Sequence, residues 1–68
     1  MDLVIEFEME EDGRWIAEVV NLPGVVAYGN TREEASAHVK ALALRVMAEK
    51  IENGETVPDF VSLSFIAA

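Results

Sequence analysis

Two groups of side chains could take part in chemistry, a run of acidic residues and a single histidine. Glu10, Glu11 and Asp12 follow one another, and carboxylate oxygens are ligands that hard divalent cations prefer. A calcium site needs about six or more oxygen ligands, however, and this run is not part of a spaced loop of the EF-hand kind. A hairpin tip exposes carboxylates at little cost, so we predict no metal site here.

His38, the only histidine, is the one candidate for a general base. A general base needs an orienting partner and a substrate within reach. Ser36 is two positions away in a predicted helix and therefore on a different face. Gly24 and Gly29 are not part of a phosphate-binding loop. We expect no enzyme and no cofactor; the alternative is a weak metal-dependent hydrolase that uses the acidic run and His38.

The composition favours a small acidic domain. The 68 residues allow one domain, residues 1–68, and 51% of them are apolar, which is high for a chain that buries so little surface by itself. Five basic and thirteen acidic residues give a formal charge of −8. This charge disfavours direct binding to nucleic acid and to anionic membranes. It fits either a basic protein partner or solubility alone.

The sequence also bears on localisation. It has no cysteine, which excludes disulfides and thiolate metal sites. The first residues carry no basic segment before an apolar run, so no signal peptide is predicted. No apolar stretch approaches the roughly 20 residues of a membrane helix. We therefore expect a cytoplasmic protein.

Alternation of apolar and polar residues predicts two strands, residues 3–9 and 14–20, joined by a hairpin. A two-residue loop would place Phe7 opposite Glu18 and bury a carboxylate, which costs several kcal/mol. A three-residue loop instead places Phe7 opposite Ala17 and Gly13 at the left-handed position. We therefore predict the three-residue loop, which also sets Met9 opposite Trp15 and Ile5 opposite Val19.

A turn at residues 21–24, with proline before glycine, favours a type II geometry and leads to a third strand at 25–28. Thr31 and Glu34 form a capping box in which each side chain bonds the other residue's backbone N–H. The capping box predicts a helix over 32–52, ended by Gly54 in the left-handed conformation.

The predicted helix has two apolar faces. One should cover the sheet and consists of Ala35, Val39, Leu42, Ala43 and Val46. The other lies on the far side, where a monomer should be polar, and consists of Ala37, Leu44, Met47, Ala48 and Ile51. We predict a homo-oligomer with Leu44, Met47 and Ile51 in the contact; the alternative is a helix end tucked under the C-terminal segment.

Residues 56–59 read as a linker, after which Val61, Leu63 and Phe65 alternate with serines in a fourth strand that ends at 66–68.

The sheet face away from the helix is the remaining candidate site. It carries Glu6, Glu8, Ile16 and Glu18. Acidic groups around apolar residues fit a docking surface for a basic protein, and a solvated sheet face explains the same residues.

Five short motifs follow one another in dense order over the first half of the chain: Glu11-Asp12-Gly13, Trp15-Ile16-Ala17-Glu18-Val19, Leu22-Pro23-Gly24, Ala27-Tyr28-Gly29 and Thr31-Arg32-Glu33-Glu34-Ala35. This order resembles the HicB-like antitoxin domain. The resemblance implies an α+β fold like a truncated ribonuclease H: a three-stranded antiparallel sheet, one long helix packed on one face, and a fourth strand beside the first and parallel to it (β-β-β-α-β).

The resemblance also implies a function. HicB-like antitoxins bind a small basic RNA-cleaving toxin, HicA-like, and block its active surface. Many carry a C-terminal ribbon-helix-helix or helix-turn-helix module for operator DNA, which this sequence does not show. The acidic metal site of a ribonuclease H has no counterpart here, and a fold alone does not license catalysis. The alternative is an orphan structural or small-ligand-binding module without a toxin.

Overall fold

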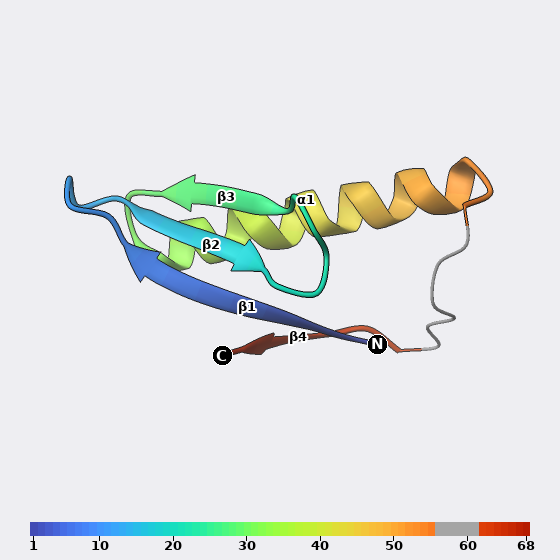
Figure 1. Cartoon of the computed structure of the whole chain (residues 1–68), viewed down its shortest axis with the longest axis horizontal. Coiled ribbons are helices and arrows are strands. Elements are labelled where there is room, and N and C mark those ends of the chain that lie inside the picture. The colour runs from blue at the N-terminus through green and yellow to red at the C-terminus, as the bar shows by residue number, and fades with distance from the viewer. Residues whose placement is uncertain (56–61) are drawn as a thin grey trace.

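The chain folds into a four-stranded mixed sheet with one long helix on one face (Figure 1). This computed structural model describes residues 1–55 and 62–68. The elements are β1 (Asp2–Met9), β2 (Trp15–Val19), β3 (Val26–Gly29), α1 (Arg32–Glu52) and β4 (Ser64–Ala67). The strand order is β3-β2-β1-β4, with β4 parallel to β1 and the other pairs antiparallel. The predicted α+β architecture is confirmed.

The β1–β2 hairpin has the predicted three-residue loop. Met9 pairs with Trp15, Phe7 with Ala17 and Ile5 with Val19. The Gly13 N–H donates to the Glu10 carbonyl at 3.0 Å, and Gly13 has a φ of +89°, which glycine adopts without steric cost. The loop length thus keeps Glu18 off the side of the sheet that the helix covers.

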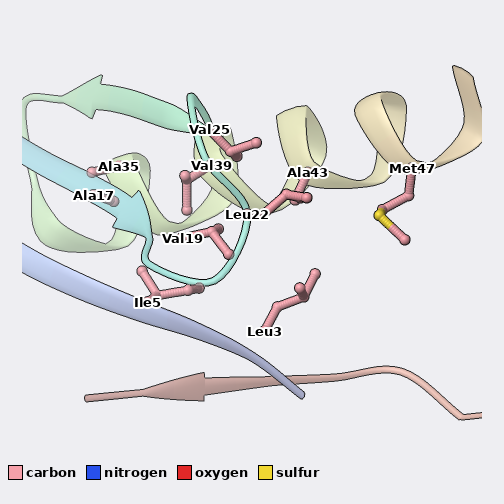
Figure 2. Close-up of a cluster of buried hydrophobic side chains, with 10 residues drawn as sticks. All are labelled: Leu3, Ile5, Ala17, Val19, Leu22, Val25, Ala35, Val39, Ala43 and Met47. Atoms are coloured by element: carbon pink, nitrogen blue, oxygen red, sulfur yellow. The ribbon is translucent and has the colours of Figure 1, made fainter. Parts of the chain in front are cut away.

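The helix-facing side of the sheet, the turn at 22–25 and one row of α1 form the core (Figure 2). Its ten residues are Leu3, Ile5, Ala17, Val19, Leu22, Val25, Ala35, Val39, Ala43 and Met47. On the helix-facing side of β1 only the first residues, Leu3 and Ile5, are buried. Further along the strand Phe7 is half-buried and Met9 is 57% exposed. Figure 1 shows the reason: the hairpin runs past the start of α1, so the helix does not cover its tip.

The predicted position of Met47 on the far helix face is wrong. Met47 is only 3% exposed and belongs to the core. The buried row on α1 repeats every fourth residue from Ala35 to Met47, and four residues turn an α-helix by about 400°, so the row drifts about 40° at each step. Leu42 and Val46, predicted for the core, are half-buried at its edge.

Both ends of α1 are capped, and the helix begins and ends where the sequence predicts. Thr31 Oγ1 accepts a hydrogen bond from the Glu34 N–H at 3.0 Å. The returning bond differs from the prediction: Glu34 Oε1 accepts from the Asn30 N–H at 3.1 Å, one residue before Thr31. At the other end Gly54 has a φ of +73°, and the Glu55 N–H donates to the Lys50 carbonyl at 2.9 Å, which is a Schellman motif.

A proline-glycine turn and one asparagine shape the end of the sheet near the N-terminus. The Val25 N–H donates to the Leu22 carbonyl at 3.2 Å, and Gly24 between them has a φ of +84°, as a type II turn requires. Asn21 accepts from the Val4 N–H at 3.1 Å and donates to the Asp2 carbonyl at 2.6 Å. Its side-chain amide therefore continues the pairing of β1 where β2 has ended.

The fourth strand completes the sheet beside β1, as predicted. Leu3 pairs with Phe65, and the Ser64 N–H donates to the Met1 carbonyl at 2.9 Å. The Met1 ammonium donates to the Ser62 carbonyl at 2.8 Å. The predicted linker at 56–59 and the strand residue Val61 lie outside the described residues.

Candidate functional site

The sheet face turned away from α1, called the outer face below, brings together the four residues predicted to bind a partner. Side chains alternate along a strand, so the burial of Ile5 and Ala17 on the helix side turns Glu6, Glu8, Ile16 and Glu18 to the other side. The β2–β3 register adds two residues that the sequence reasoning missed, because Tyr28 pairs with Ile16 and Val26 with Glu18. Alternation counted from the turn at 22–25 is the signal that could have found both.

The centre of the outer face is a shallow hollow of about 240 Å³ lined by Glu6, Phe7, Glu8, Ile16 and Glu18. Glu6 is directly opposite Glu18 across the β1–β2 pair, and Glu8 is opposite Ile16. Three carboxylates thus surround one half-buried isoleucine. This arrangement suits the stem and charged end of a long basic side chain.

The carboxylates of the outer face have no cation of their own within the described parts of the chain. The two ion pairs found in residues 1–55 and 62–68 join Arg14 to Asp12 and Lys50 to Glu55. Directly opposed like charges destabilise an antiparallel pair by a few tenths of a kcal/mol to about 1 kcal/mol. The Glu6–Glu18 pair therefore costs the free domain stability, and such local conflicts are concentrated at functional sites.

Arg14 is near this face, but its guanidinium is directed to the hairpin tip. Its Nε lies 2.8 Å from Asp12 Oδ2, and its backbone N–H donates to Asp12 Oδ1 at 3.1 Å. These bonds, the backbone one foremost, lower the pKa of the Asp12 carboxyl. The guanidinium also lies 5.0 Å from the centre of the Tyr28 ring. Glu10 and Arg14 are joined across the hairpin by their backbones, since the Glu10 N–H donates to the Arg14 carbonyl at 2.7 Å, whereas the ion pair of Arg14 is made with Asp12.

The residues of the rival hydrolase hypothesis lie on separate elements. Glu10, Glu11 and Asp12 belong to the hairpin tip, whereas His38 is an exposed residue of α1. His38 Nδ1 lies 2.8 Å from the Tyr28 carbonyl oxygen, and since a carbonyl only accepts, this nitrogen carries the proton. Among the described residues no three His, Asp or Glu side chains are grouped so that they could hold a metal ion.

The far helix face shows two of its three predicted contact residues on the surface. Leu44 is 47% exposed and Ile51 is 50% exposed, whereas Met47 is buried in the core and unavailable to a second protein. No helix in the described part of the chain is long and apolar enough to cross a membrane.

Comparison of the chain with models of known protein families, with curated proteins and with solved structures gives no match in any of the three. The geometry of the outer face and the charge of the chain therefore carry the functional argument.

Proposed function

We propose that this protein is a non-enzymatic, cytoplasmic interaction domain of the HicB-like antitoxin kind. It binds a small basic RNA-cleaving toxin of the HicA-like kind through the outer face and occludes the surface that cleaves RNA. The observation that carries this proposal is the uncompensated group of Glu6, Glu8 and Glu18 around Ile16. The motif order of the first half of the chain and the charge of −8 point in the same direction.

Binding follows from the electrostatics of this face. The net charge steers a basic protein toward the domain, and the rate of association falls as salt screens the field. A lysine or arginine of the toxin then lies along Ile16 with its charged end among the carboxylates. Each such contact removes the repulsion between Glu6 and Glu18 and covers a cation that the toxin needs for RNA.

The repulsion itself can be measured in the free domain. Replacing Glu18 by lysine converts its pair with Glu6 into an attraction, so the variant should be more stable than the wild type by about 0.5 kcal/mol. Urea unfolding at low ionic strength measures the difference, and about 1 M salt should remove most of it by screening. A variant that is no more stable than the wild type would show that the two carboxylates do not repel each other appreciably.

The proposed function is tested by affinity purification from the native cells at low and at high salt, with mass spectrometry of the bound proteins. The wild type should retain a small basic protein at low salt and lose it at high salt. A Glu6→Lys/Glu8→Lys double variant should lose it at both.

The matched control for this purification is Glu11→Lys/Glu49→Lys. It makes the same change in net charge at two exposed positions off the outer face, so it should still retain the basic protein at low salt. Retention by the Glu6/Glu8 variant, or no basic protein with the wild type, would contradict the proposal. The latter outcome would leave the orphan module as the better description.

A further inference from the structure

The exposed side of α1 carries a second periodic pattern, distinct from the buried row. Its residues, called the seam below, are Ala37, Ala41, Leu44, Ala48 and Ile51, all exposed. Their spacing alternates between four and three residues. That is the heptad spacing with which one α-helix packs along another.

We propose that two copies of this chain associate through the seam, with their α1 helices antiparallel about a two-fold axis. A two-fold axis requires one patch to complement itself. In one antiparallel register Leu44 of each copy meets Ala48 of the other, and Ile51 meets Ala41 of the other. Every large side chain then packs against a small one, which permits a close approach of the two helices.

The charge distribution favours a second copy as the occupant. Helix α1 contains four of the five basic residues of the chain together with four glutamates, so its formal charge is zero. The remaining residues therefore carry the entire formal charge of −8. Two copies that met through their outer faces would bring like charges together, whereas two copies that meet along α1 avoid that repulsion.

The seam corrects and extends the contact predicted from the sequence. Met47 belongs to the core and is replaced by Ala41, which lies between Ala37 and Leu44 in the heptad pattern. Because the seam and the outer face lie on opposite sides of the molecule, this association does not rest on the proposed toxin binding. A monomer could still capture a basic protein, and a dimer could exist without one.

The mass of the full chain in solution tests the proposal. A seam of about two heptads is short, so sedimentation equilibrium should cover about 1 µM to 1 mM. We expect the mass to rise with concentration from the 7.5 kDa of one chain toward twice that value. Leu44→Glu/Ile51→Glu replaces two exposed residues and should keep the mass of one chain throughout. A wild type that stays at 7.5 kDa up to 1 mM would overturn the proposal.

The matched control is Val20→Glu/Ile66→Glu, which makes the same charge change at two exposed residues of the outer face. It should still double its mass. A monomeric control would overturn the proposal, whatever the seam variant does. The loss of association would then come from the added charge, or the contact would lie at the β4 edge and not at the seam.

The register can be tested separately because the native chain has no cysteine. A mixture of Leu44→Cys and Ala48→Cys chains should form a disulfide-linked heterodimer under mild oxidation. The link should be lost when Glu33→Cys replaces Ala48→Cys, because residue 33 lies at the start of α1, beyond the seam. Equal linkage in the two mixtures would overturn the antiparallel register.

Discussion

Replacing Gly29 by alanine should destabilise the protein by about 3 kcal/mol, the largest effect we expect from a single methyl group. Gly29 is the buried last residue of β3 and lies directly against the first turn of α1. A Cβ there would collide with the backbone nitrogen of Ala35 and would lie 2.9 Å from the carbonyl carbon and Cβ of Glu34. Backbone atoms at a capped helix start cannot move aside as a flexible side chain can.

Gly13→Ala is the control for this substitution. A Cβ at Gly13 meets no atom within 4 Å, so the only cost is the strain of the left-handed backbone, about 1 kcal/mol. Urea unfolding of both variants measures the two losses. Equal losses at the two positions would show that the close approach of β3 to α1 contributes nothing. Since natural domains are stable by only about 5–15 kcal/mol, the loss at Gly29 should remove a large fraction of the free energy of unfolding and lower the urea midpoint clearly below that of the Gly13 variant.

Truncation of Ile5 should have the largest effect in the core, about 3 kcal/mol for Ile5→Ala. Ile5 is 2% exposed and lies on the central strand β1, between Val19 of β2 and Ala67 of β4. Removing its side chain leaves a cavity between sheet and helix, and in so small a core few neighbours can move to fill it.

Ile66→Ala is the matched control on the neighbouring strand. Ile66 is 44% exposed on the outer face, so its truncation should cost about 1 kcal/mol or less. Thermal and urea unfolding of both variants give the comparison. A loss at Ile66 as large as the loss at Ile5 would mean that the outer face is covered in solution, for example by another protein.

The sequence was sufficient to predict the hairpin register and both ends of the helix. The register followed from one large energy difference, because the wrong loop length would have buried the carboxylate of Glu18. The helix ends followed from local hydrogen bonding by Thr31 and from the backbone freedom of Gly54. Such features depend on neighbours in the chain and need no knowledge of the tertiary arrangement.

Features that depend on how the helix lies on the sheet could not be predicted from the sequence. Met47 was assigned to the surface because the direction in which the buried row drifts is set by the sheet beneath it. Met9 falls in the same alternation as Leu3 and Ile5 but is exposed, because the hairpin extends beyond the start of α1, and this extension is visible only in three dimensions (Figure 1). At the candidate site, alternation within the hairpin was enough to place Glu6 and Glu18 on the outer face. Placing Tyr28 there also requires the pairing of β3 with β2, which sets Tyr28 opposite Ile16.

The pairing of the first strand with the last has a consequence for folding. Leu3 and Phe65 are partners from opposite ends of the chain, so their contact closes the longest loop in the molecule and carries the largest closure entropy. We expect the β1–β2–β3 sheet and α1 to form first and β4 to dock last. Until β4 docks, β1 is an edge strand with unpaired backbone N–H and C=O groups. A strand from another molecule could pair with β1 at this edge.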